Sequence, residues 1–263
     1  MSATVRDQGE HVTGASPAGA ADERAAAHAV QQMFDEISPR YDLLNHVLSM
    51  NVDRLWWWRA ARTFRSALRK PGASALDLCC GTGDMARALR KQAPRARIAG
   101  LDFSRGMLTR GRAKFVQQRI APVEGDALHL PFPDQTFDVV VSAFGFRNLA
   151  NYDAGLREIY RVLRPDGQVG ILDFSEPGGV LGRLYGFYFR NVLPKIGTFI
   201  SGVPGPYSYL PASVSRFPSP AEMIERMEGV GYANAGWQPY TFGIAGLYRA
   251  TKRMVEAKSP QNS

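Results

Sequence analysis

The strongest constraint on the fold is a change of rhythm after Pro71-Gly72. From about residue 25 to 69, apolar residues recur every three or four positions, which is typical of helices and leaves no predicted strand. Downstream, short apolar stretches alternate with amphipathic ones, which indicates a parallel sheet built from βαβ units. The expected strands are 74–80, 97–103, 121–125, 137–144, 168–174, 234–241 and 244–251, and the expected helices 84–92, 104–119, 152–163 and 220–230.

The length of 263 residues is long for one domain, but single α/β domains with extensions reach it. Residues 1–22 are rich in Ala, Gly, Ser and Thr, and such a composition predicts a disordered tail. We expect a helical N-terminal extension over 23–70 and an α/β domain over 71–252. Within that domain 177–218 is expected to form a lid or insert, and 253–263 a flexible C-terminus.

The formal charge of +8 suits nucleic acid, an anionic membrane surface or an acidic ligand. The arginines are scattered at helix-like spacings, so we interpret most of them as solvated helix faces and expect no nucleic-acid partner. Early acids argue against a secretory signal, and no apolar run is long enough to span a membrane. Two cysteines without a signal sequence favour a reducing, cytoplasmic location.

A glycine-rich turn follows the first predicted strand. Gly81-Thr82-Gly83 and the three residues after it fit G-x-G-x-x-A, the pattern that also marks dinucleotide sites. In such sites a pyrophosphate binds the first amides of the next helix, where this chain has Asp84. A carboxylate there repels phosphate and tolerates a cation, so we favour S-adenosylmethionine as the cofactor. A nucleotide-binding module without enzymatic activity, such as an NAD sensor, stays the distant alternative.

Acidic residues end the next two strands. Asp102 follows the second strand, where it would accept hydrogen bonds from vicinal ribose hydroxyls, and Asp126 follows the third, near the expected adenine. Ligands of open α/β sheets bind at the carboxyl ends of the strands, so the order of these acids supports a cofactor site. A helix cap or turn is the alternative role of each acid.

The two cysteines, Cys79 and Cys80, lie side by side in the turn. They have no companion cysteines, no CxxC spacing and no clustered histidines, so neither a zinc nor a dithiol site is predicted. Adjacent cysteines also rarely form a disulfide. We interpret them as the floor of the cofactor pocket and expect no metal.

Several stretches resemble motifs of class I methyltransferases: ALDLCCGTGDMA, GLDFSRGML, ALHLPFPDQTFDVV and YRVLRPDGQVGILDFS. The stretch MFDEISPRYDLLNHVLSMNVDRLWWWR, FGFRN at 144–148 and YSYLPASVSRFP at 207–218 resemble the demethylmenaquinone and ubiquinone C-methyltransferase family. The likeness covers about residues 28–252. It implies a Rossmann-like fold, with a mostly parallel seven-stranded sheet and helices on both faces, so 71–252 would be a methyltransferase domain.

The resemblance also implies cofactor contacts. They fall on the turn and on the residues that end the strands: Asp77, Gly81, Thr82, Gly83, Asp102, Asp126, Ala127 and Ala143. Cys79 takes the place of the first glycine of the turn in many methyltransferases. Ala143 stands where the family sometimes has serine, and Asp173 where it often has glutamate.

Methylation of a demethylmenaquinol ring carbon is the implied reaction, with benzoquinol, sterol or phenol acceptors as alternatives. Carbon is a poor nucleophile, so the phenol must lose a proton, which requires a base and an oxyanion partner. The catalytic candidates are Arg147, Asn148, Asp173 and Tyr207, with Asp173 as base. Tyr41, Arg147 and Tyr209 are expected to bind the acceptor, although a plain ion pair is the alternative role of Arg147.

Two aromatic stretches suggest further contacts. Trp56, Trp57 and Trp58 cannot all face one core, because successive helical residues point about 100° apart. The segment GRLYGFYFRNVLPKIGTFISG would either pack over the sheet or cover a polyprenyl tail and contact the membrane. Peripheral association with the inner face of the membrane follows as a hypothesis.

Overall fold

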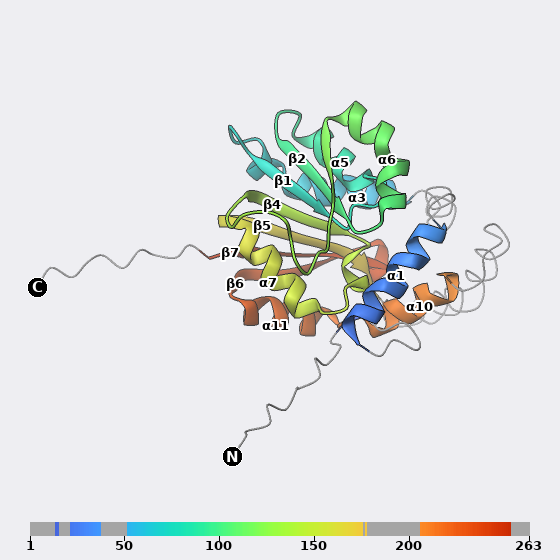
Figure 1. Ribbon diagram of the computed structural model, residues 1–263. Helices are drawn as coiled ribbons and strands as arrows, with labels where there is room; N and C mark the ends of the chain where they lie inside the picture. Colours follow the sequence, from blue (N-terminus) through green and yellow to red (C-terminus); the bar gives the residue numbers. More distant parts are fainter. Residues whose placement is uncertain (1–13, 16–21, 38–51, 176, 178–205, 254–263) are drawn as a thin grey trace, which may run out of the picture.

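The computed structural model describes residues 14–15, 22–37, 52–175, 177 and 206–253 (Figure 1). The described residues form a seven-stranded sheet of order β3-β2-β1-β4-β5-β7-β6. Strands β1 to β5 run parallel, and β7 is antiparallel to both β5 and β6. The predicted mostly parallel sheet is confirmed. Its strands are β1 Ser74–Leu78, β2 Arg97–Asp102, β3 Ile120–Glu124, β4 Phe137–Ala143, β5 Leu163–Phe174, β6 Tyr232–Tyr240 and β7 Ala245–Lys252.

Helices cover both faces of this sheet. They are α1 Glu23–Ile37, α3 Val52–Thr63, α4 Arg65–Leu68, α5 Asp84–Gln92, α6 Arg105–Gln118, α7 Tyr152–Val162, α10 Pro206–Arg216 and α11 Pro220–Val230, with short 3₁₀ turns η2 Phe146–Asn148 and η4 Thr241–Gly243. Helix α11 begins at a capping box, in which Ser219 and Glu222 bond each other's backbone, and ends at Gly231 with φ 111°.

The predicted strands and helices end within about two residues of the observed ones, except at the start of β5. Strand β5 begins at Leu163, five residues early, because Leu163 pairs with Phe137 across a register shift. Strand β6 begins at Tyr232 directly after the glycine cap. Neither the Leu163–Phe137 pair nor the start of β6 at Tyr232 has a local sequence signal.

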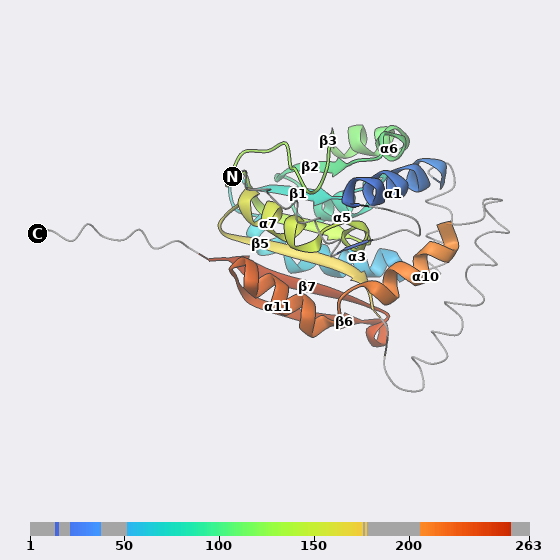
Figure 2. The same cartoon turned by 60° about the horizontal axis from the view of Figure 1, so that its bottom comes forward.

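Two apolar layers lie on opposite faces of the sheet. One packs α3, α4, α5 and α6 against the strands, and the other packs α7 and α11 (Figures 1 and 2). The helices α3 and α4, which the sequence assigns to the extension, therefore share a core with β1 and α5. Trp56 and Trp57 are buried in it, whereas Trp58 is 44% exposed, so the prediction that the three cannot all face one core is confirmed.

Helix α1 lies over the carboxyl end of β2. Gln31 donates to the Phe103 carbonyl at 2.7 Å, and Asp35 accepts hydrogen bonds from the Ser104 hydroxyl and the Gly106 amide. These contacts place α1 above the strand ends where the cofactor site is predicted. Among the described residues, no helix has the length and apolar character needed to cross a bilayer.

Candidate active site

The glycine-rich turn joins β1 to α5 through left-handed backbone. Cys79, Gly81 and Gly83 have φ values of 55°, 53° and 88°. Positive φ at Cys79 explains why glycine suits that position in related turns. At Gly83 a Cβ atom would lie 2.4 Å from the Phe115 ring, so only glycine fits between the turn and α6.

Asp102 ties this turn to the end of β2. Its Oδ2 atom accepts from the Gly81 amide at 2.7 Å, and its Oδ1 atom accepts from the Ser104 amide at 2.9 Å. Burial raises the pKa of Asp102 to about 6, while the amides of Ser104 and Gly81 oppose that rise. The carboxyl group therefore lines the cleft and also holds the loop that forms its floor.

Asp77 lies beneath the same turn and is fully buried. Its Oδ2 atom accepts from the Ala86 amide at 2.8 Å, whereas Oδ1 has no hydrogen-bond partner among the described residues. Desolvation raises the pKa of this carboxyl to about 8. A buried acceptor without a partner suits a ligand with a cationic donor, because such a group regains its lost hydration only through a new bond.

The surroundings of Asp84 differ from the expectation that its carboxylate repels a phosphate. Its carboxylate is 2.9 Å from Lys114 Nζ and 3.0 Å from Arg87 Nη2, and Lys114 also donates to the Thr82 hydroxyl. Two cations therefore offset the charge that was expected to repel a phosphate. The preference for a cationic cofactor rests instead on the buried Asp77 and Asp102.

The predicted adenine end lies in the loop after β3. Asp126 accepts from the Leu128 amide at 2.9 Å and contacts His129 at 3.2 Å, with its side chain half exposed, while Ala127 is buried. His129 is largely exposed.

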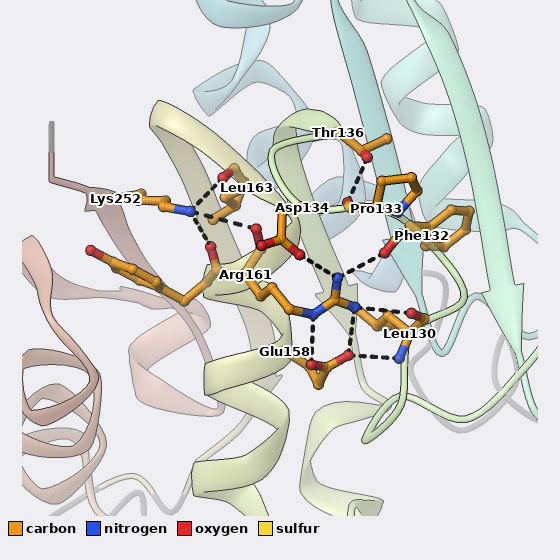
Figure 3. Close-up of polar contacts among 10 residues, drawn as sticks. Leu130, Phe132, Pro133, Asp134, Thr136, Glu158, Arg161, Leu163 and Lys252 are labelled. Carbon is orange, nitrogen blue, oxygen red and sulfur yellow. Dashed lines mark hydrogen bonds and ion pairs between the residues drawn. The ribbon is translucent and has the colours of Figure 1, made fainter. Parts of the chain in front are cut away.

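The next part of that loop is held by Arg161 of α7 (Figure 3). Its guanidinium binds both oxygens of Glu158 at 2.8 Å and donates to the carbonyls of Leu130 and Phe132. A further contact to Asp134 measures 2.9 Å. Arg161 thereby fixes residues 130–134 against α7, a role for which the sequence offers no local signal.

A cleft of about 700 Å³, part of it open to solvent, lies at the carboxyl ends of the strands. Predicted cofactor residues Gly81, Asp102, Asp126, Ala127 and Ala143 line it. Helix α1 and the segment after β4 complete the wall with Ala27, Phe34, Phe144, Asn148, Leu149 and Ala150. Asp77, Thr82 and Gly83 lie in or below the turn that forms its floor.

Arg147 and Asp173 form a buried ion pair at the ends of β4 and β5. Arg147 Nη1 lies 2.9 Å from Asp173 Oδ1, and the Arg147 amide donates to Oδ2 at 3.2 Å. Asp173 is fully buried, and burial raises its pKa although Arg147 opposes the rise. The sequence assigned separate roles to these two residues, and the structure joins them.

Helix α10 contacts this pair from outside the sheet. Arg147 Nε donates to Ser213 at 3.4 Å, and Tyr209 donates to Asn148 Oδ1 at 3.2 Å. Burial raises the pKa of Tyr209. Ser213 was not predicted. Tyr41 and the Tyr207 side chain lie outside the described residues.

Aromatic rings form one side of the same region, and sequence reasoning missed them as a group. The Phe144 and Phe174 rings are tilted by 36° with centroids 4.6 Å apart, and the Trp56 ring lies 5.8 Å and 6.1 Å from them. The Arg147 guanidinium is 5.4 Å from the centre of the Phe174 ring. The cation is therefore held between a carboxylate and an apolar wall.

Cys79 lines the cleft, whereas Cys80 is buried in the apolar core and does not line it. Desolvation, aided by the charges of Asp102 and Asp77, holds the pKa of both thiols well above its ordinary value. They stay protonated, which makes them poor nucleophiles. In the part of the chain that the structure describes, no three His, Cys, Asp or Glu residues cluster in a way that could hold a metal ion.

Comparison with known proteins gives a family match. The model of the ubiE/COQ5 methyltransferase family matches residues 20–252. The chain is 46% identical to the demethylmenaquinone methyltransferase of Deinococcus radiodurans, over 88% of this chain and 96% of that protein. It is 43% identical to the ubiquinone/menaquinone biosynthesis C-methyltransferase UbiE of Geobacter sulfurreducens, over 85% and 88%.

Solved structures show the same fold at low identity. A SAM-dependent methyltransferase from Thermotoga maritima, described as a possible histamine N-methyltransferase, superposes with a TM-score of 0.59 at 18% identity. The match covers 85% of this chain and 99% of that one. At this identity the likeness concerns the fold alone.

Proposed function

The chain belongs to the ubiE/COQ5 methyltransferase family, and from that premise we propose that it methylates a ring carbon of a demethylmenaquinol with S-adenosylmethionine as donor. Enzymes of this family are C-methyltransferases of quinone biosynthesis, and this chain is one of them. The naphthoquinol acceptor is supported by relatives named demethylmenaquinone methyltransferase. The benzoquinol acceptor is the second candidate, because other relatives are named for both quinones.

One observation carries the proposal: the acids at the strand ends and the Arg147 region border the same cleft. Asp102, Asp126 and Asn148, which directly follows Arg147, are among the residues that line it. A methyl donor and its acceptor must meet within one space from which water is excluded. The helix α1 supports such exclusion because Ala27 and Phe34 cover the cleft.

We assign cofactor contacts to the residues around the turn. Asp102 would accept from the ribose hydroxyls and Asp126, beside Ala127, from the adenine amino group. Asp77 Oδ1 is buried and has no hydrogen-bond partner among the described residues, so it suits an ammonium group as donor. Gly81, Thr82, Gly83 and Ala143 offer backbone and small side chains that let a ligand approach closely. When bound, S-adenosylmethionine supplies an electrophilic methyl group on a sulfonium.

Arg147 and Asn148 are proposed to hold the acceptor. Arg147 Nη1 is engaged by Asp173, which leaves Nη2 without a partner among the described residues. That group can donate to a phenolate oxygen and favour its ionisation. We propose that Asn148 and Tyr209, which are hydrogen-bonded to each other, bind the second ring oxygen. Tyr41 and Tyr207 stay predicted contacts.

Asp173 is proposed to accept the phenol proton. Burial raises its pKa, which makes the carboxylate a stronger base than an exposed aspartate. Both of its oxygens already accept hydrogen bonds from Arg147 and the Phe174 amide. A water molecule would therefore relay the proton. We further propose a cytoplasmic enzyme that meets its acceptor at the inner face of the membrane.

The acceptor is tested by supplying demethylmenaquinol and demethyl-benzoquinol analogues separately with isotope-labelled S-adenosylmethionine. Product mass should show methyl transfer to the naphthoquinol, and transfer to the benzoquinol alone would overturn that choice. Calorimetric binding of NAD but not of S-adenosylhomocysteine would overturn the reaction class. Unchanged turnover in Arg147→Ala would remove Arg147 from the mechanism.

A further inference from the structure

The positive charge of the chain is concentrated in residues 52–119. This segment holds 16 Lys and Arg against four Asp, a formal net charge of +12 compared with +8 for the whole chain. Three of the four acids, Asp53, Asp77 and Asp102, are buried, and Asp84 is paired with Lys114 and Arg87. The helices α3 to α6 therefore present a surface of cations without a free acid among their described residues.

Apolar side chains are exposed within this basic surface. On α3, Arg54, Leu55, Trp58 and Arg62 share the outer side of the helix, with Leu55 50% and Trp58 44% exposed. The Arg62 guanidinium lies 5.2 Å from the centre of the Trp58 ring. Exposed Arg65 continues the row on α4. A helix face that contacts only water is expected to carry polar residues, so an exposed Leu and Trp between arginines indicate a contact with something else.

The turn η4 adds a third apolar side chain. Phe242 is 82% exposed and has a φ of 57°, a left-handed conformation that is costly for an aromatic residue. Trp56 Nε1 donates to the Thr241 hydroxyl at 2.8 Å, which ties η4 to α3. We define the α3–η4 face as Arg54, Leu55, Trp58, Arg62, Arg65 and Phe242. It contains three of the four large apolar side chains that are exposed among the described residues.

We propose that the α3–η4 face docks on the surface of an anionic lipid bilayer. Trp and Phe insert at the boundary between headgroups and acyl chains, while arginines bind the phosphates above them. A nucleic acid would use the arginines but gain little from the exposed side chains of Leu55 and Phe242. A second protein copy would bring the same row of arginines against itself, and like charges repel.

The position of this face relative to the cleft gives the contact a purpose. Trp56, on the inner side of the same helical turn as Leu55 and Trp58, packs against Phe144 and Phe174. Phe144 lines the cleft. The acceptor region therefore lies one helix away from the proposed bilayer surface. This purpose, unlike the docking itself, rests on the proposed polyprenyl quinol acceptor.

Vesicle flotation of the full chain tests the docking. We expect binding to phosphatidylglycerol-containing vesicles, weak binding to pure phosphatidylcholine, and loss of binding at high salt. Arg62→Gln with Arg65→Gln should weaken partitioning about 30-fold, since each cation near the surface contributes about fivefold. Arg157→Gln with Arg216→Gln, which removes two exposed cations elsewhere, is the matched control and should bind as the wild type does.

The apolar contribution is tested in the same assay. Trp58→Ser with Phe242→Ser should weaken partitioning at least about tenfold, because both side chains lose their insertion into the interface. Val116→Ser on α6, 73% exposed and outside the face, is the control and should change nothing. Equal binding by the wild type and both α3–η4 double variants would overturn the proposal, as would wild-type binding to nucleic acid but not to vesicles.

A kinetic split separates this inference from the proposed function. With a short-tailed, water-soluble acceptor the α3–η4 variants should keep wild-type turnover, whereas with a long-tailed acceptor carried in vesicles their KM should rise. A wild type that methylates the soluble acceptor but does not bind vesicles overturns the docking alone. A wild type that binds vesicles but methylates neither acceptor overturns the proposed function alone.

Discussion

Replacing Arg161 with methionine removes the fork that holds the loop after β3 while keeping a side chain of similar length. The guanidinium binds both oxygens of Glu158, the carbonyls of Leu130 and Phe132, and Asp134 (Figure 3). Glu158 also accepts from the Leu130 amide at 2.8 Å. Methionine leaves two carbonyls and two carboxylates without these donors.

The structure sets the size of the loss. Asp134 is 72% exposed, so its ion pair with Arg161 contributes little. The bidentate bond to Glu158 is partly shielded and contributes about 1 kcal/mol, and each carbonyl about 0.5–1 kcal/mol. Together these contacts stabilise the fold by about 2–3 kcal/mol. For a domain of this size the melting temperature should fall by about 5–10 °C.

Urea unfolding followed by circular dichroism measures this loss, and Arg164→Met provides the matched control. The Arg164 side chain is similarly exposed, at 36%, but its guanidinium binds one carboxylate, Asp138, and the Ser74 hydroxyl. We expect a smaller loss there, about 1 kcal/mol. Because the Arg161 loop begins at Asp126, affinity for S-adenosylhomocysteine should also fall in Arg161→Met. Equal losses of stability in the two variants, with unchanged ligand affinity, would refute the reasoning.

Three further substitutions have defined outcomes. The pKa of Asp77 is raised to about 8 in the folded state, so its contribution to stability is lost as pH rises from about 4 to 8. The free energy of unfolding should fall by up to about 1.4 kcal/mol per pH unit over this range. Asp77→Asn should remove that pH dependence, which urea midpoints at about pH 5 and about pH 8 measure. Gly83→Ala should lower the free energy of unfolding by at least about 2 kcal/mol more than Gly72→Ala. Both glycines have positive φ, but only at Gly83 would the new Cβ atom meet an aromatic ring, that of Phe115. Equal losses of stability in denaturant unfolding would contradict this. Arg147→Met leaves the buried Asp173 carboxylate unpaired and should destabilise the fold by about 3–5 kcal/mol. Thermal melts should show a smaller loss of stability at low pH, where the carboxylate is protonated. A loss that does not depend on pH would count against the pairing.

The features that local sequence rules govern were predictable. The glycine turn was recognised from Gly81 and Gly83, and the positive φ values there follow from the need to bring the backbone close to a ligand. Asp102 could be placed because every parallel strand ends at the same edge of the sheet. Its bond to the Gly81 amide, 21 residues away, was beyond such rules.

The contacts that depend on neighbouring strands and helices were not predictable. Arg147 and Asp173 are 26 residues apart and meet because β4 pairs with β5. Asp84 was judged from its helix position alone, and its partner Lys114 comes from α6. In both cases the sequence did not name the opposite charge that the fold places beside the residue: an ion pair was an alternative role of Arg147, but Asp173 was not identified as its partner.

The proposed cofactor site and the proposed membrane contact place opposite electrostatic demands on residues 52–119, and burial would meet both. A cationic methyl donor requires carboxyl oxygens, whereas an anionic membrane surface requires cations without exposed acids. The segment places Asp77 and Asp102 at strand ends, inside the sheet edge, and its arginines on the outer sides of α3 and α4. Burial raises the pKa of both acids, so the interior carries less negative charge than its composition suggests until a cation binds there. Guanidinium groups are charged at any physiological pH, so the outer surface stays positive. The charge of the buried acids, in contrast, would change when a cationic ligand binds.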